Sequence, residues 1–147
     1  MVKVLIKKLN PTVQLPEYKT KGASGMDLVA FIKIPIYIKP KTSSLVPTGI
    51  SVAFSEDYEI QIRPRSGLAV KNNISVLNTP GTIDSDYRGE IKVIIYNHGE
   101  KDFIINSGDR IAQMILAPVA KIELEEIDNL PETIRGEGGF GSTGKWI

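Results

Sequence analysis

The stretch Tyr58–Arg63, which reads YEIQIR, alternates apolar and polar side chains along its length. Because successive side chains of a β-strand point to opposite faces of a sheet, this period of two predicts a strand with one buried face. The same period runs from Ile32 to Ile38, where four isoleucines flank a lysine, a proline and a tyrosine. Further strands are predicted at Val2–Leu9, Ile50–Phe54, Ile74–Asn78, Ile91–Asn97, Phe103–Ile105 and Arg110–Ala117.

Many short strands separated by Gly, Pro, Asn and Asp predict an all-β sandwich or barrel. One short helix is predicted from Ser66 to Lys71, with Ser66 as its cap. Long helical patterns are absent, which argues against a parallel-sheet nucleotide fold. We find no repeat or second domain, and interpret Asp128–Thr133 as a spacer that releases a C-terminal tail.

Composition limits the classes of function. The 147 residues are 41% hydrophobic, as expected for one globular domain. Eighteen Lys and Arg against 17 Asp and Glu give a net charge of +1, so no global field recruits nucleic acid or anionic lipid. Neither a signal peptide nor a membrane-spanning run is present, so a cytoplasmic protein is expected.

The residue types also exclude several kinds of site. With no cysteine, the chain has neither disulfides nor thiolate metal ligands. His98 is the only histidine, which excludes a zinc site built on several histidines. It lies in the turn-like sequence NHGE and is predicted to be a solvated turn residue.

Five glycines fall within the segment Arg135–Gly144, RGEGGFGSTG. Bare backbone N–H groups of such a segment can wrap a phosphate, and Arg135, Ser142 and Thr143 add donors. Phe140 could stack on a base. The alternative is a disordered glycine tail.

A second candidate for anion binding is Arg63–Ala69, RPRSGLA. Arg65 offers a bidentate guanidinium, while Ser66 and Gly67 offer a hydroxyl and an unobstructed N–H at a helix start. Ordinary surface turns also contain this combination of residues.

The segment Gly81–Ile91, GTIDSDYRGEI, holds two acids and a tyrosine between glycines. An aspartate here could activate water by taking its proton, a role that a hydrolase without a usable histidine must give to a carboxylate. The alternative is a hairpin turn in which Asp84 and Asp86 bond the backbone. Asp27 beside a turn and Gln113 among apolar residues have equally simple structural explanations.

Taken together and in order, the segment around Asp27 and the stretches PRSG, GTIDSDYRG, GDRIAQ and RGEGGFGSTG resemble the five motifs of the trimeric dUTPase family, the deoxyuridine 5'-triphosphate nucleotidohydrolases. The resemblance spans Ala23 to Gly144. It implies a jelly-roll-like distorted β-barrel of the dUTPase-like β-clip type over residues 1–130. Residues 131–147 would form a flexible tail that closes over an active site.

The resemblance further implies a homotrimer with active sites at subunit interfaces and with Mg²⁺ as cofactor. The implied reaction is hydrolysis of dUTP to dUMP and pyrophosphate by attack of water on the α-phosphorus. This reaction would keep uracil out of DNA and supply dUMP for thymidylate synthesis. No stable nucleic-acid or membrane partner is expected.

Roles carry over from the family residue by residue. Asp84 matches the aspartate that activates water, and Tyr87 the tyrosine that stacks under the deoxyribose and excludes a 2′-hydroxyl. Asp27 resembles the acid that holds water molecules of the magnesium ion, and Gln113 the amide that orients the phosphates and the nucleophile.

The remaining matches bind the substrate. The hairpin that pairs with uracil corresponds to Asn78, Thr82, Ile83 and Lys92. Phosphate ligands donated by a neighbouring subunit correspond to Arg65, Ser66 and Gly67. The tail that covers uracil and binds the γ-phosphate corresponds to Arg135, Phe140, Gly141, Ser142 and Thr143.

Two alternatives stay open beside the dUTP pyrophosphatase. The first is dCTP deaminase, a related enzyme of the same fold, which would release ammonia where a pyrophosphatase releases pyrophosphate. The pattern from Asp84 to Tyr87 fits the hydrolase. The second is a non-catalytic β-sandwich that senses nucleotides, and the intact Asp84 argues against it.

Overall fold

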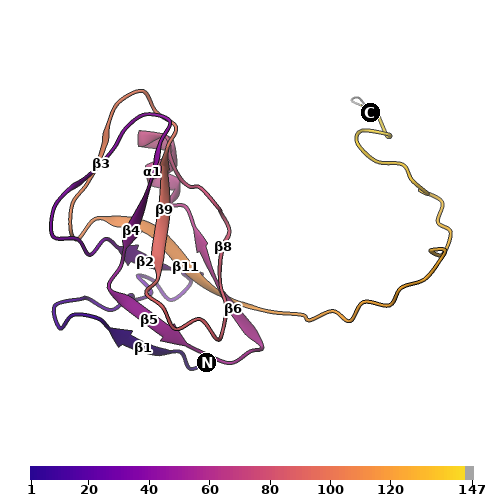
Figure 1. The fold of residues 1–147 in the computed structure, drawn as a ribbon, viewed down its shortest axis with the longest axis horizontal. Helices are drawn as coiled ribbons and strands as arrows, with labels where there is room; N and C mark the ends of the chain where they lie inside the picture. The colour runs from indigo at the N-terminus through magenta and orange to yellow at the C-terminus, as the bar shows by residue number, and fades with distance from the viewer. Residues whose placement is uncertain (145–147) are drawn as a thin grey trace.

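The computed structural model describes residues 1–144, which form eleven strands and one helix (Figure 1). Residues 145–147, the end of the predicted tail, lie outside the described part. The elements are β1 (Leu5–Lys8), β2 (Met26–Val29), β3 (Ile36–Ile38), β4 (Ser43–Pro47), β5 (Ile50–Ala53), β6 (Tyr58–Arg63), α1 (Ser66–Asn72), β7 (Ile74–Val76), β8 (Gly81–Ile83), β9 (Lys92–Asn97), β10 (Phe103–Ile105) and β11 (Arg110–Pro118).

The strands pair antiparallel in four sheets. The largest has the order β2-β11-β6-β8, the second the order β4-β9-β7, and the pairs β1-β5 and β10-β3 complete the body. An all-β fold with one short helix is thus confirmed for residues 1–144. Within these residues, however, the sheets do not close into a continuous hydrogen-bonded barrel.

The core lies between the sheets and follows the predicted alternation. In β6, Ile60 and Ile62 are 1% and 3% exposed, and in β9, Val93 and Ile95 are 1% and 0% exposed. Burying a side chain of this size contributes about 1.5–3 kcal/mol to folding. Further members of the same core are Leu28, Ile38, Val46, Ile50, Ile74, Val76, Ile91, Ile105 and Ile111.

Three local predictions differ from the structure. Only Ile36–Ile38 of the Ile32–Ile38 stretch is a strand, and Ile34 is 76% exposed, because Pro35 has no N–H to donate to a ladder. The helix is capped by Arg65 without a side-chain hydrogen bond, so Ser66 is its first residue and not its cap. Strands β2, β4 and β8 lie outside the predicted strand ranges.

Strand β11 ends at Pro118, and residues 119–144 contain no helix or strand. They leave the body as a long extended segment, which we call the arm (Figure 1). Near its start, Lys121 Nζ lies 3.1 Å from Glu56 Oε2. No helix within the described residues is long and apolar enough to span a membrane.

Asn97, at the end of β9, is a buried polar residue that connects three parts of the body. It is 1% exposed, and its Nδ2 donates to the carbonyls of Ile38, at 2.9 Å, and Lys101, at 2.8 Å. Its Oδ1 accepts the N–H of Gly99 at 2.9 Å. Each of these three backbone groups would lose its partner if the amide were removed.

We therefore predict that Asn97→Ala lowers the free energy of unfolding by about 2–4 kcal/mol, because buried polar groups are left unsatisfied. Urea denaturation followed by circular dichroism measures this difference. The control is Asn72→Ala, an exposed asparagine at the end of α1, which should change stability by no more than about 0.5 kcal/mol. Equal effects of the two variants would contradict the role of the buried amide.

Candidate active site

A cavity of about 430 Å³ opens between the two larger sheets. Six of the predicted site residues line it, with three residues that were not predicted. The lining consists of Leu45, Asn78, Thr82, Ile83, Asp84, Tyr87, Glu90, Lys92 and Ile94. We call this cavity the hairpin pocket, after the segment that supplies most of its wall.

The pocket exists because β8 and β9 belong to different sheets. Thr82 in β8 pairs with Gln61 of β6, whereas Lys92 in β9 pairs with Pro47 of β4. The predicted hairpin is therefore wrong as a hydrogen-bonded ladder: residues 84–91 cross from one sheet to the other. The two strands diverge, and a cleft lined by both remains between them.

Asp84 lies at the start of this crossover, on its exposed side. Its backbone carbonyl accepts the Tyr87 N–H at 3.1 Å, which closes a turn. The far end of the crossover is fixed to the body, because the Ile91 N–H donates to the Ile50 carbonyl at 2.8 Å. The crossover thus carries an exposed carboxylate and the aromatic ring of Tyr87, which is 44% exposed, at one pocket.

A second group of polar side chains, which we call the arginine cluster, forms around Asp27 in β2. Arg65 Nε lies 2.9 Å from Asp27 Oδ1, and Arg110 Nη1 lies 3.3 Å from Asp27 Oδ2. Arg65 Nη1 also donates to the Arg110 carbonyl at 3.2 Å. The carboxylate, 20% exposed, therefore holds two guanidinium groups side by side. Guanidinium groups in this arrangement bind phosphate oxygens well.

A β-bulge accounts for the position of Arg110. Residues three apart on a regular strand point to opposite faces, but the register of β11 against β2 shifts between Arg110 and Ala112. Arg110 then pairs with Val29 and Gln113 pairs with Asp27, two residues that share a face. The bulge thereby places the arginine and the glutamine on the same side of the sheet.

Gln113 completes this side of the cluster. Its Nε2 donates to the Pro64 carbonyl at 2.9 Å, which links β11 to the segment that carries Arg65. A Cβ on Gly25 would lie 2.9 Å from Gln113 Oε1, so the glycine leaves room for the amide in this position. Ser66 and Gly67 follow as the first, exposed residues of α1.

The hairpin pocket and the arginine cluster lie apart within one chain. Asp27 is on β2 and Thr82 on β8, the two outer strands of the sheet β2-β11-β6-β8. Three strand spacings separate outer strands of a four-stranded sheet, a distance of about 14 Å. The structure thus brings the predicted residues together in two groups.

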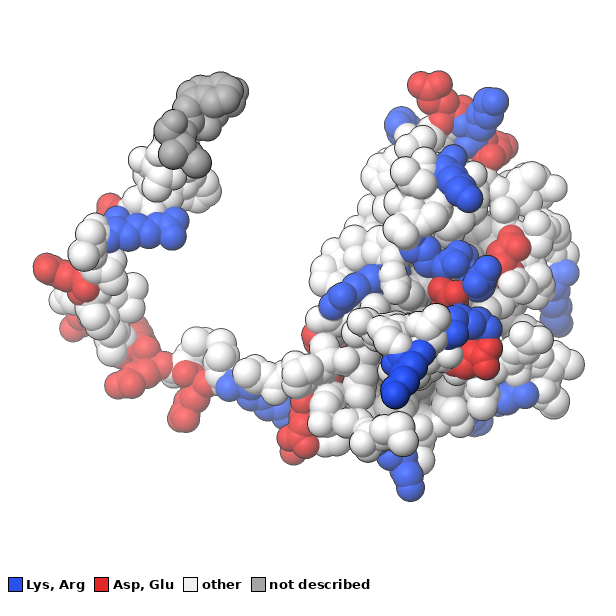
Figure 2. Space-filling view, turned by 180° about the vertical axis from the view of Figure 1, so that it is seen from behind, with Lys and Arg blue, Asp and Glu red and all other residues white. Residues whose placement is uncertain are grey.

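The predicted tail residues join neither group. Phe140 and Arg135 lie on the arm with their side chains exposed, and Arg135 Nε donates to the Gly138 carbonyl at 2.6 Å. Ser142 and Gly144 form local turns with other arm residues. Figure 2 shows mostly acidic side chains along the arm, whereas acidic and basic side chains are mixed on the body.

The cluster around Asp27 could contact, through water molecules, a metal ion that is already bound to the phosphates of a ligand. Within residues 1–144 no group of three acidic, His or Cys side chains could hold an ion alone. Mg²⁺ usually keeps several waters and binds one or two carboxylates together with phosphates. Each Asp27 oxygen already accepts from an arginine but keeps a further acceptor position, which fits contact through water.

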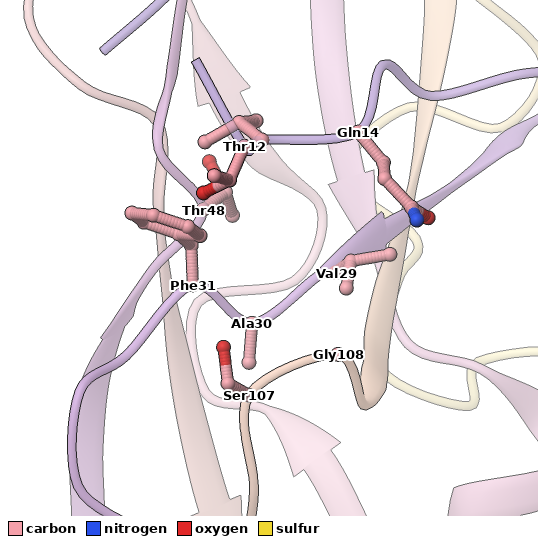
Figure 3. A pocket seen from close by; sticks show the side chains of 9 residues that line it. Thr12, Gln14, Val29, Ala30, Phe31, Thr48, Ser107 and Gly108 are labelled. Carbon is pink, nitrogen blue, oxygen red and sulfur yellow. The ribbon is translucent and has the colours of Figure 1, made fainter. Parts of the chain in front are cut away.

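A cavity of about 260 Å³ lies elsewhere, and Figure 3 shows its lining. Thr12 and Gln14 come from the segment after β1, Val29 from the end of β2, and Ser107 and Gly108 from the turn before β11. Its lining includes no ionisable side chain and none of the predicted site residues. It therefore lacks a group for acid–base chemistry.

His98 also lies outside both groups. It is exposed in the turn after β9, as predicted. Its Nε2 is 2.7 Å from Ser75 Oγ, and its ring packs against Tyr96 with centroids 4.5 Å apart. Among the described contacts of His98 there is no acidic side chain of the kind that completes a Ser-His-Asp triad.

Sequence reasoning missed Glu90, Arg110, Leu45 and Ile94 as site residues. Glu90 and Arg110 lie inside the GTIDSDYRGE and GDRIAQ segments, so their charge and their position within a motif could have identified them as site residues. Leu45 comes from β4, which belongs to no motif, and only the pairing of β4 with β9 brings it to the pocket.

Comparisons with known proteins identify the family of the chain. Residues 12–144 match the family model described as dUTPase. Curated proteins named deoxyuridine 5'-triphosphate nucleotidohydrolase are 58% identical in Rickettsia conorii and 57% identical in Rickettsia prowazekii, over 98% of this chain and 98% of each relative.

Solved structures show the same fold at lower identity. A mutant dUTPase of Staphylococcus bacteriophage 80alpha with dUpNHpp matches with a TM-score of 0.86 at 24% identity, over 97% of this chain and 98% of that chain. The dUTPase of S. aureus phage phi11 matches with a TM-score of 0.79 at 20% identity, over 89% and 99%. These likenesses confirm the jelly-roll-like β fold, and the match of both sequence and family model shows that the chain belongs to the dUTPase family.

Proposed function

We propose that the protein is a dUTP diphosphatase, which hydrolyses dUTP to dUMP and pyrophosphate, and that Asp84 activates the attacking water. The observation that carries the mechanism is the hairpin pocket, where Asp84, Tyr87, Asn78 and Lys92 line one cavity. Membership of the dUTPase family supports the reaction.

The nucleoside would occupy the hairpin pocket. Its volume of about 430 Å³ lies within the usual range for small-molecule sites. Asn78, from the turn before β8, lines the cleft together with Thr82 and Ile83 of β8. Their amide and backbone groups would bond a base that has two carbonyls and one N–H. Tyr87 would form the wall under the sugar and exclude a 2′-hydroxyl.

The triphosphate would lie against an arginine cluster. Arg65 and Arg110 supply charge, Ser66 and Gly67 supply donors at the start of α1, and Gln113 supplies an amide. Magnesium bound to the triphosphate would neutralise the charge that develops on the phosphates. Asp27 would hold its water molecules, and a mutant phi11 dUTPase coordinates a structural Mg(II) ion.

The chemical step uses the exposed carboxylate. Asp84 would take a proton from a water molecule while the oxygen of that water forms a bond to the α-phosphorus. The bond from the α-phosphorus to the bridging oxygen then breaks, and its electron pair leaves with pyrophosphate. The far end of the loop that holds Asp84 is fixed to β5 through Ile91 and Ile50, which would help to keep the base at the pocket.

We further propose that the active site is shared in a homotrimer. The hairpin pocket and the arginine cluster of one chain are separated by three strand spacings, about 14 Å. A neighbouring copy could place its arginine cluster against the pocket. Exposed apolar side chains on β1 and the arm also support this proposal, because contact with other subunits would bury them. Among them, Leu5 is 63% exposed and Leu124 is 87% exposed.

The arm would complete the site. Its segment from Arg135 would bind the γ-phosphate through Ser142 and Thr143 with the Gly141 backbone, and Phe140 would cover uracil. Base–aromatic stacking of this kind contributes about 1–3 kcal/mol. Ordering of the arm would exclude bulk water from the reacting groups.

Asp84→Asn should keep the fold and nucleotide binding but lower turnover of dUTP by about 10²–10⁴-fold, the usual effect of removing a general base. Release of pyrophosphate and of ammonia, measured with dUTP, dCTP, dTTP and UTP plus magnesium, checks this. Asp86→Asn is the matched control, since Asp86 is exposed two residues away and does not line the pocket. If Asp84→Asn turns over dUTP within a factor of two of the unmodified protein, Asp84 is not the general base.

Mixed trimers test the shared site. Refolding Asp84→Asn chains together with chains truncated before Arg135 should restore activity that neither parent shows, because some sites would combine an intact hairpin with an intact arm. A chain that carries both changes, mixed with either parent, serves as the control and should restore nothing. No recovery in confirmed mixed trimers would refute sharing of the arm.

A further inference from the structure

We infer that Gly89 sets the preference for deoxyribose over ribose, because its missing side chain provides the space in which the Tyr87 ring lies. The inference rests on the proposed role of Tyr87 as the wall under the sugar. It assigns a positioning role to a residue that does not itself line the pocket.

The ring of Tyr87 folds back over the chain that follows it. Its hydroxyl donates to the Glu90 carbonyl at 3.0 Å, so the ring spans residue 89. A Cβ on Gly89 would lie 2.2 Å from Tyr87 Oη and 2.4 Å from its Cζ. Both separations are far inside van der Waals contact, so any side chain at position 89 excludes the observed ring position.

The acceptor of the hydroxyl is itself held in place. Glu90 Oε1 accepts the Gly49 N–H at 2.9 Å, and the next residue, Ile91, donates its N–H to the Ile50 carbonyl at 2.8 Å. Residues 90 and 91 are therefore tied to the start of β5. The Tyr87 ring lies over the backbone of Gly89, and its hydroxyl donates to the fixed carbonyl of Glu90. These two contacts define the position of the ring at the pocket.

A side chain at position 89 should move the ring without unfolding the protein. The atoms that it would strike belong to the outer end of the Tyr87 side chain, which is 44% exposed and can turn toward solvent. Alanine is also compatible with the backbone, because Gly89 is not among the positive-φ glycines. Gly89→Ala should thus keep the fold but displace the wall under the sugar.

The experiment compares four variants: Gly89→Ala, Tyr87→Ala, the double variant, and Gly22→Ala. Gly22 is the control because no atom lies within 4 Å of a Cβ built there. Two ratios are measured for each variant, kcat/KM for dUTP against UTP and the dissociation constants of dUMP against UMP. The second ratio is independent of the chemical step, so it separates sugar selection from the role of Asp84.

We expect Gly89→Ala and Tyr87→Ala each to lower the preference for the deoxyribonucleotide, in both kcat/KM and dissociation constant, by at least about tenfold. A site typically rejects a ligand with one added hydroxyl by roughly 10²-fold, so this change would remove a substantial part of the preference. The double variant should narrow them no further, because both changes remove the same wall. Gly22→Ala should leave them unchanged.

Three outcomes would overturn the inference. Unchanged ratios in Gly89→Ala while Tyr87→Ala narrows them would remove Gly89 and leave the role of Tyr87 intact. Unchanged ratios in Tyr87→Ala would show that the proposed role of the ring is itself wrong. A folding defect of Gly89→Ala that persists in the double variant would show that the backbone, and not the Tyr87 ring, requires glycine at position 89. If removal of the ring in the double variant relieves the defect, the close approach of the ring to Gly89 is supported.

Discussion

Strand β11 is hydrogen-bonded on both of its edges, to β2 on one side and to β6 on the other. Its register brings Gln113 opposite Asp27, and a bulge turns Arg110 toward the same carboxylate. The amide of Gln113 then reaches the segment before α1, where Arg65 pairs with Asp27. A slip of one residue in either pairing would send these side chains to opposite faces, so the arginine cluster depends on this ladder.

The width of the same sheet sets the distance between the hairpin pocket and the arginine cluster within one chain. The crossover from β8 to β9 leaves a pocket at one outer strand, while the arginine cluster lies at the other. Hydrogen bonding fixes the spacing of the strands, so the two groups stay about 14 Å apart within one chain, and the proposed trimer would bring the cluster of one copy to the pocket of another. The division of a nucleoside pocket and a phosphate site between subunits would then follow from sheet geometry.

Charge is distributed unevenly between the body and the arm, although the chain as a whole has a net charge of only +1. Residues 119–144 hold six acidic and two basic side chains, so the body carries the excess of Lys and Arg. An acidic arm is attracted to a basic body within about a Debye length, 8–10 Å at ordinary salt, which would favour docking of the arm onto a subunit.

The sequence by itself determined the alternation of β6 and β9, the short helix near Ser66 and most of the residues that line the hairpin pocket. These are local properties, because strand periodicity and motif spacing need only neighbouring residues. Tertiary structure alone decided that β8 and β9 lie in different sheets, that a bulge turns Arg110 toward Asp27, and that the Tyr87 ring lies over Gly89. Each of these depends on pairing or close approach in three dimensions, which composition and spacing do not specify.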